Sequence, residues 1–331
     1  MKAIFISDIH MHNYKQFNAK GERMLYITRI LDYVFKFADA NKIVDIFMPG
    51  DIFDQFGNVS VLALLALLHC LRKNFKEYPN IKWYGISGNH DMATKTVGPN
   101  YGISSQAILS FIFPANYTLL DGMNRINPKF IVMGVPHYED PNGFWDTVTR
   151  LCGDLVKLGN ERKAPVYLMM HQMVWPENPM VPDDVNFEDN RFKFFTRIFN
   201  GHVHHMSIVS DTFINVGSPI HRDAGDVGKR KGFWIVELDD PNVIPKFWDI
   251  TEKAPEIIRK PYGEAVTGWE KDQHIIWFHP EAAIKKKSQV DFDSSKFTTQ
   301  LTPEELVVNY CKEVKPDDRK LREMGVKFVQ S

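Results

Sequence analysis

The chain has 331 residues, of which 44% are hydrophobic and 24% are charged, and its formal net charge is -1. This composition is ordinary for a folded globular protein and argues against intrinsic disorder. A near-neutral charge excludes a globally basic protein, so a nucleic-acid partner would be bound by a local basic surface or by metal ions. The length predicts one large domain with a smaller addition, or about two domains.

The cysteines and the apolar stretches bear on the compartment. Cys70, Cys152 and Cys311 are widely spaced and form neither a disulfide framework nor a CxxC zinc pattern, so we expect a reducing, cytoplasmic location. The longest apolar stretch, Val61 to Leu71, is too short to cross a bilayer. The N-terminal apolar run already ends at Asp8, which is too early for a signal peptide. We therefore expect a soluble protein that does not associate with a membrane.

Up to about residue 238, short apolar runs bounded by Gly, Pro, Asn or Asp alternate with helical patterns. Apolar residues of Met24–Ala40 recur at helical spacing, and Val61–Phe75 is apolar nearly all round, as in a helix packed on a sheet. Strands interleaved with helices predict an α/β layered domain. The predicted strands are Lys2–Ile6, Val44–Met48, Lys82–Ile86, Lys129–Val135, Val166–Met170, Arg197–Phe199, Phe213–Val216 and Phe233–Leu238.

Beyond residue 250 the pattern changes and predicts a small C-terminal extension. Prolines, glycines and a run of three lysines at 285–287 indicate a linker. A helix is then predicted from Thr302, which can cap it, with Glu305 completing a capping box. A second short helix over Asp317–Met324 would complete a helical hairpin. The predicted divisions are a main domain over 1–250, a linker segment over 251–295 and a helical segment over 296–331.

Five short motifs carry side chains that can bind metals, and each begins where a predicted strand ends. Because ligands bind at the carboxyl edge of the strands in α/β sheets, we expect these side chains to converge there. The motifs are Asp8-Ile9-His10, Gly50-Asp51-Ile52-Phe53-Asp54, Gly88-Asn89-His90-Asp91, the single His171, and Gly201-His202-Val203-His204.

The residue types in these motifs suit two divalent cations. Carboxylate, imidazole and amide oxygen donors are present and thiolate is absent, which favours manganese, iron, zinc or magnesium. Two such ions about 3.5–4 Å apart would share a bridging carboxylate and stabilise both the attacking and the leaving oxygen of a phosphoryl displacement.

Taken singly, most of the motifs allow a plainer interpretation. Asp-x-His can end a strand, Asp54 can cap a helix, and a lone His171 can be a hydrogen-bonded core residue. Gly-Asn-His-Asp is more specific because a turn does not need histidine, and Gly-His-x-His places two imidazoles on one face of an extended segment. The combination, in this order at strand ends, favours a metal centre.

With these motifs the chain resembles the calcineurin-like metallophosphoesterase superfamily over residues 8 to 204. The resemblance implies the metallophosphoesterase fold, a layered β-sandwich flanked by helices. It also implies that His90 assists the leaving oxygen, that Asp91 orients the His90 ring, and that Asp54 lies behind the metal ligands. The implied ligands are Asp8, His10 and His204 for one metal, Asn89, His171 and His202 for the other, and Asp51 as the bridge.

Within that superfamily the chain looks like the SbcD/Mre branch of DNA double-strand-break repair nucleases. Gln55 and Phe56 stand where protein Ser/Thr phosphatases carry Arg-Gly, and the Gly217–Pro219 turn and the Thr302–Leu306 segment are similar to this branch. The likeness implies a manganese-dependent 3′–5′ exonuclease and endonuclease acting on DNA ends, with magnesium, iron or zinc as other possible metals. It further implies a homodimer, an SbcC-type coiled-coil ATPase bound through residues 296–331, and a reduced DNA-capping segment over 251–295.

A few basic residues outside the metal motifs are candidate contacts to the DNA backbone. His12 follows the first motif, and Lys229, Arg230 and Lys231 follow the Gly-Ser-Pro turn. An ordinary loop or hairpin-tip position is the competing interpretation for each of them. His137, at the end of a predicted strand, could line the cleft or simply pack in its loop.

Three functions stay open at the level of sequence. The first is the metal-dependent DNA nuclease. The second is another esterase on the same scaffold, a cyclic-nucleotide phosphodiesterase or a protein phosphatase, because a shared fold does not decide the substrate. The third is a non-catalytic scaffold that binds DNA ends or tethers an ATPase.

Overall fold

The computed structural model describes residues 1–13, 23–54, 58–92, 104–157, 164–176, 183–268 and 272–278. The chain divides into two compact units, one of Met1–Arg259 with Ala265–Ile276 and one of Lys260–Glu264 with Trp277–Ser331. The first unit contains all five predicted metal motifs.

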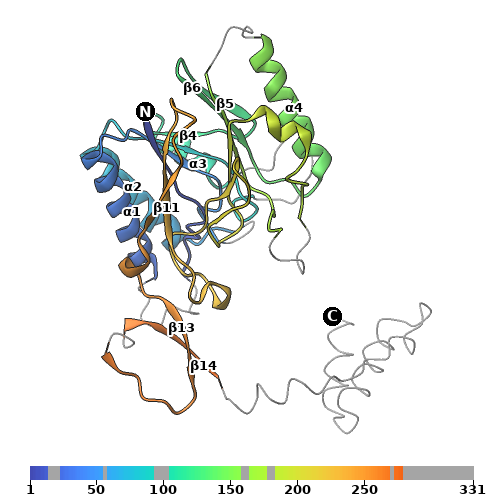
Figure 1. Cartoon of the computed structure of the whole chain (residues 1–331). Helices are drawn as coiled ribbons and strands as arrows, with labels where there is room; N and C mark the ends of the chain where they lie inside the picture. The colour runs from blue at the N-terminus through green and yellow to red at the C-terminus, as the bar shows by residue number, and fades with distance from the viewer. Residues whose placement is uncertain are drawn as a thin grey trace, which may run out of the picture. The chain divides into compact units, whose positions relative to one another are not determined.

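The first unit is built on two six-stranded sheets (Figure 1). In the first sheet, β1 to β4 run parallel to one another, while β11 pairs antiparallel with β1 and β12 antiparallel with β11. The strand order is β12-β11-β1-β2-β3-β4. The strands are β1 (Lys2–Phe5), β2 (Asp45–Met48), β3 (Lys82–Gly85), β4 (Tyr117–Leu119), β11 (Gly232–Glu237) and β12 (Lys246–Asp249).

The second sheet has the order β5-β6-β7-β8-β10-β9. Its four central strands are parallel, and β5 and β9 pair antiparallel at the two edges. The strands are β5 (Met123–Asn127), β6 (Phe130–Val135), β7 (Val166–Met170), β8 (Arg197–Asn200), β9 (Ser207–Ile208) and β10 (Phe213–Asn215).

Helices cover the outer face of each sheet (Figure 1). α1 (Arg23–Ala40) and α2 (Val61–Glu77) bury their apolar residues with those of the first sheet, and α3 (Ala107–Ile112) adds Leu109 to that cluster. α4 (Pro141–Lys157) packs its apolar face on the second sheet. The layers are therefore helix, sheet, sheet and helix, which confirms the predicted sandwich flanked by helices.

A core of aromatic and aliphatic side chains joins the two sheets. The Phe5 ring stacks on Phe199 of the opposite sheet, with centroids 3.8 Å apart, and on Phe47 at 5.0 Å. β2 and β6 are buried along their whole length, because both of their faces are covered. This explains why the predicted strands are nearly continuous apolar runs without polar alternation.

The predicted central strands and the helices α1 and α2 are confirmed within about two residues of their expected ends, the usual spread of boundary definitions. The sequence pattern did not predict α4, in which Gly143 and Gly153 interrupt the helical signal, nor the short edge strands. Residues 251–278 also contain more structure than the predicted linker, because β13 (Ile257–Pro261) and β14 (His274–Phe278) form a two-stranded sheet.

The predicted C-terminal helices at 302–324 lie outside the described residues. Among the described helices, none is long and apolar enough to span a membrane.

The contact between Phe5 and Phe199 gives a test of this architecture. Phe199 is fully buried, so Phe199→Ala leaves a cavity between the sheets and should lower the free energy of unfolding by about 3–5 kcal/mol. Phe111→Ala is the matched control, because Phe111 is 87% exposed and its loss should change stability by less than about 0.5 kcal/mol. Urea unfolding measures both, and equal effects would contradict the sandwich core.

Candidate dinuclear metal centre

The five motifs meet where the carboxyl ends of the central strands of both sheets come together. Asp8, Asp51 and Asn89 follow β1, β2 and β3 of the first sheet, while His171 follows β7 and the Gly-His-x-His motif follows β8 of the second. The backbone amide of His202 donates to the Asp8 Oδ1 atom at 3.0 Å, which links the two sheets at this point. The expected convergence of the motifs is therefore present.

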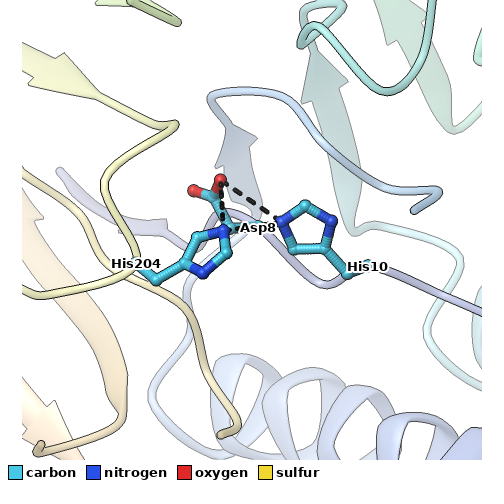
Figure 2. Close-up of side chains that lie close together, drawn as sticks. All are labelled: Asp8, His10 and His204. Atoms are coloured by element: carbon cyan, nitrogen blue, oxygen red, sulfur yellow. Dashed lines mark hydrogen bonds and ion pairs between the residues drawn. The ribbon is translucent and has the colours of Figure 1, made fainter. Parts of the chain in front are cut away.

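One group of possible ligands is formed by Asp8, His10 and His204, whose ligand atoms all lie within 4.8 Å of one another. Figure 2 shows the two imidazole rings pointing toward the Asp8 carboxylate. The Nε2 atoms of His10 and His204 are 2.9 Å apart, and they lie 3.7 and 3.9 Å from Asp8 Oδ1. Three donors thus surround one point.

A second group is formed by Asp51, His171 and His202, with Asn89 beside them. The Asn89 Oδ1 atom lies 3.1 Å from His171 Nε2 and 2.9 Å from His202 Nδ1. His171 Nδ1 donates to the Pro49 carbonyl at 2.6 Å, so its Nε2 atom faces the other donors. A carbonyl that accepts from the outer nitrogen of a histidine ligand fixes the orientation and the tautomer of the ring.

Asp51 lies between the two groups. Its Oδ2 atom is 3.6 Å from His10 Nε2 in the first group and 3.4 Å from His171 Nε2 in the second. One carboxylate oxygen therefore faces both groups, as a carboxylate that bridges two metal ions does.

The backbone at the site adopts strained conformations that the sheet ends impose. Asp8, His10, Asp51 and His202 all have positive φ angles, between 48° and 72°, and only one other described non-glycine residue, Lys42, does so. Such conformations cost free energy and persist where the surrounding structure enforces them, commonly at functional sites. Here they turn consecutive side chains toward one point.

The glycines of the motifs are explained by close approach. A Cβ atom on Gly50 would lie 2.3 Å from His171 Nδ1, one on Gly88 would lie 2.1 Å from Asp51 Oδ1, and one on Gly201 would lie 2.0 Å from the Pro49 carbonyl oxygen. Any side chain at these positions would displace the candidate ligands or the backbone beside them. The sequence showed these glycines, but only the structure shows why they are needed.

Burial and the mutual charges perturb the ionisation of these groups. Burial lowers the pKa of His202 to about 3 and that of His204 to about 4, so both rings are neutral and can donate a lone pair. Burial raises the pKa of Asp8 to about 7. Burial acts in the same direction on Asp51, but the neighbouring His171 outweighs it and holds the pKa of Asp51 well below its usual value.

These donors fit two divalent ions. Asp8 and Asp51 are 0% and 1% exposed. Two carboxylates buried this deeply in one site require positive charge nearby. The Asp8 Oδ2 atom is fully buried and has no hydrogen-bond partner, although Oδ1 accepts from His202. Nitrogen and oxygen donors without thiolate suit manganese, iron, zinc or magnesium alike.

His90 lies at the edge of the site and Asp91 lies behind it, but the predicted pairing of the two side chains is wrong. His90 Nδ1 donates to the Asp54 backbone carbonyl at 2.6 Å, so a carbonyl, and not Asp91, fixes the ring. The Asp91 carboxylate instead accepts the backbone amides of Asp51, Phe53 and Gly88 at 2.7, 3.1 and 3.0 Å. Asp91 therefore holds two metal motifs in place.

Asp54 lies behind His10, as the resemblance implied. Its Oδ1 atom is 2.9 Å from His10 Nδ1 and accepts from Arg222 Nε at 2.8 Å. A carboxylate against the outer nitrogen leaves His10 Nε2 free to act as a ligand. No sequence signal pointed to Arg222, which lies in a polar segment between a turn and a strand.

The four residues predicted to contact DNA differ in their exposure to solvent. Lys231 is 1% exposed and His12 is 6% exposed, so the expectation that these two contact DNA is wrong. Arg230 is exposed and pairs with Asp249 at 2.6 Å on the surface. Lys229 is half-buried and lines a pocket together with Asp51 and His90.

A pocket of about 290 Å³ opens over the site. Asp51, His90 and the histidines of the last motif line it, together with Arg222 and Lys229. Beside it, the ring of His137 stacks on that of His202, with centroids 5.8 Å apart, and His137 Nδ1 donates to the His171 carbonyl at 3.0 Å. His137 thus packs against the site and also supports one of its motifs.

The hydrogen bonds of Asp91 give a test of the local architecture. Asp91→Asn replaces one acceptor oxygen by an NH₂ group that faces backbone donors, and each buried donor left unpaired costs about 1–3 kcal/mol. We expect a loss of at least that size in urea unfolding. Asp146→Asn, at an exposed position of α4, is the control. Equal stability of the two variants would show that Asp91 does not hold the motifs.

Comparisons with known proteins give one family and two individual similarities. Over 292 residues the chain is 25% identical to the D subunit of the nuclease SbcCD from Staphylococcus saprophyticus subsp. saprophyticus, a match that covers 80% of this chain and 73% of that protein. In structure it is similar to a dimetal phosphatase from Danio rerio, with a TM-score of 0.44 and 12% identity over 72% of this chain and 92% of the other. The calcineurin-like phosphoesterase family matches residues 1–206, a segment that contains all five motifs. The chain therefore belongs to the calcineurin-like metallophosphoesterase family.

Proposed function

We propose that this protein is a DNA nuclease that hydrolyses phosphodiester bonds at DNA ends, with 3′–5′ exonuclease and endonuclease activity, and that it depends on two divalent metal ions, in the first place manganese. The observation that carries the proposal is the position of Asp51 Oδ2 between two groups of buried ligands. The similarity to a component of the SbcCD nuclease favours DNA over other phosphoesters.

The assigned ligands are those that the structure brings together. Asp8, His10 and His204 would hold one ion, Asn89, His171 and His202 the other, and Asp51 both. When bound, such a pair of ions supplies an activated water at neutral pH and charge that stabilises the attacking and leaving oxygens. The protein would contribute the geometry, because the motifs lie at strand ends and the strained backbone of Asp8, His10, Asp51 and His202 turns these four ligands toward the site.

His90 is the proposed proton donor. Because its Nδ1 atom donates to the Asp54 carbonyl, Nε2 is the nitrogen that would carry the second proton of the imidazolium form, and the side chain lines the pocket beside Asp51. A proton held there can pass to the departing oxygen, which prevents charge from building up on it. Arg222 and Lys229 on the pocket wall add positive charge for the phosphate backbone of the substrate.

Two parts of the proposal concern residues outside the site. An SbcC-type coiled-coil ATPase would be held by the helical segment 296–331, and residues 251–295 would serve as a reduced capping segment beside the 1–250 catalytic domain. The similarity to a component of SbcCD supports the ATPase as partner. The proposal includes a cytoplasmic location without membrane association, because the protein would encounter DNA and the ATPase in the cytoplasm.

His90→Ala tests the chemistry. We expect manganese-dependent cleavage of linear duplex DNA to fall by about 10²–10⁴-fold, the usual contribution of a positioned acid or base. Manganese binding, measured by calorimetry, should persist because His90 is not among the assigned ligands. His69→Ala, an exposed histidine on α2, is the control and should cleave like the wild type. Full activity of His90→Ala would refute the assigned role.

The same assay separates the other functions. A substrate panel should include a cyclic nucleotide and a phosphoprotein beside DNA. Turnover of either without DNA cleavage would replace the nuclease by a different phosphoesterase. No binding of divalent ions at micromolar concentration would favour a non-catalytic scaffold.

The proposed homodimer finds support at the start of α2. Val61, Leu62 and Leu65 are 68%, 59% and 56% exposed, and they lie within about one helical turn of one another. Grouped apolar exposure of this kind marks surfaces that associate, and a second copy of the chain is the occupant we propose.

Leu62→Glu with Leu65→Glu should abolish that dimer, because two charges would have to be buried at the contact. Light scattering after gel filtration should give the mass of a dimer for the wild type and of a monomer for the variant. Val156→Glu, at an apolar position of α4 that is 57% exposed, is the control and should remain dimeric. A monomeric wild type, or a variant that stays dimeric, would refute this surface as the interface.

A further inference from the structure

Lys231 is a buried lysine next to the metal centre. Its side chain is 1% exposed, and its Nζ atom donates to the Asp226 carboxylate and, at 3.1 Å, to the backbone carbonyl of His204. Asp226 is almost as buried, with a side chain 4% exposed. An ion pair so deeply buried requires good geometry and further hydrogen bonds to be tolerated. Both are present here, and one of those bonds goes to an assigned metal ligand.

Asp226 extends the connection into the segment that follows the Gly-Ser-Pro turn. Its second oxygen accepts the backbone amides of Arg222 at 2.8 Å and Asp223 at 3.3 Å. Asp223 forms a capping box with Asp226 around a short 3₁₀ helix, and its side chain also accepts the backbone amide of Gly225. The conformation of this segment therefore depends on the Asp226 side chain.

The same segment carries Arg222 to the metal centre. Arg222 Nε donates to Asp54 Oδ1 at 2.8 Å, and that oxygen lies 2.9 Å from His10 Nδ1. Lys231 thus reaches His204 directly through its carbonyl, and it reaches His10 through Asp226, Arg222 and Asp54. Both histidines belong to the ligand group of Asp8.

The other ligand group is supported by different atoms. His171 is oriented by the Pro49 carbonyl and His202 packs on His137. The part of the chain that the structure describes shows no hydrogen bond or ion pair from Lys231 to either residue. The hydrogen bonds of Lys231 therefore lead to the Asp8/His10/His204 group.

We infer that the Lys231–Asp226 pair positions His204 and His10, and so sets the metal affinity of the Asp8/His10/His204 site and not that of the Asn89/His171/His202 site. The inference rests on the proposed metal assignment. Lys231 and Asp226 are positioning residues, because neither is an assigned ligand. Loss of groups that orient metal ligands typically weakens metal binding by about 10–100-fold, which sets the expected effect.

The test measures Mn²⁺ binding by calorimetry in two backgrounds that each retain one site. In His202→Ala, which retains the Asp8/His10/His204 site, adding Lys231→Met should raise the dissociation constant by about 10–100-fold. In His10→Ala, which retains the other site, adding Lys231→Met should leave it unchanged. Lys246→Met, at an exposed position of β12, is the control in both backgrounds.

A second variant separates positioning from stability. Lys231→Met leaves Asp226 as an unpaired buried charge and should lower the melting temperature, whereas Lys231→Met with Asp226→Asn removes that charge, keeps an oxygen that can accept the Arg222 and Asp223 amides, and should recover much of the loss. If positioning is the role, Mn²⁺ affinity in the His202→Ala background stays weak in the double variant. Affinity that returns with the melting temperature would overturn the inference.

Other outcomes are equally decisive. An unchanged dissociation constant for Lys231→Met in the His202→Ala background overturns the inference while the metal assignment stands. Equal losses in both backgrounds overturn the claim of selectivity for one site. A wild-type protein that binds no Mn²⁺ refutes the proposed function itself, which is a different result.

Discussion

The site depends on two carboxylates, Asp8 and Asp51, that the fold buries almost completely at the junction of its two sheets. Carboxylates without water around them are stable only beside positive charge or strong hydrogen-bond donors. Two nearby features meet part of that demand, because the amide of His202 donates to Asp8 and His171 lies next to Asp51. The neutral ring of His202 offers a lone pair, which a metal ion can accept. A pair of divalent ions satisfies the same demand in full, which is why the buried charge and the proposed metal chemistry have one cause.

The sandwich core supplies the rigidity that this arrangement requires. Four motif residues have positive φ angles, and three motif glycines touch ligands so closely that a Cβ atom would displace them. Such strain costs free energy, which is offset by the aromatic and aliphatic packing between the sheets directly beneath. Asp91 connects the second and third motifs, because its carboxylate accepts backbone amides from both. The backbone at the ends of the sheets therefore fixes the positions of the candidate ligands.

The surroundings of the two candidate ligand groups differ. One group is oriented by charged side chains, the Asp54–Arg222 pair and the buried Lys231–Asp226 pair. The other is oriented by a backbone carbonyl and a stacked ring, that of His137. Charged supports come from the segment after the Gly-Ser-Pro turn, which also lines the pocket. The candidate ligand group with the charged supports is thus supported by a segment that also lines the pocket.

The sequence by itself determined the layered α/β class, the central strands and the candidate ligands, because strand periodicity and ligand chemistry are local properties that leave a visible pattern. It did not determine the partners of those ligands. Asp91 proved to hold backbone amides and not His90, and Lys231 proved to be buried and not available to DNA. Arg222 was not singled out at all. Only the tertiary structure decided these points, because hydrogen-bond partners and burial depend on which distant segments meet, and a polar residue in a loop looks the same in sequence whether it faces solvent or a buried charge.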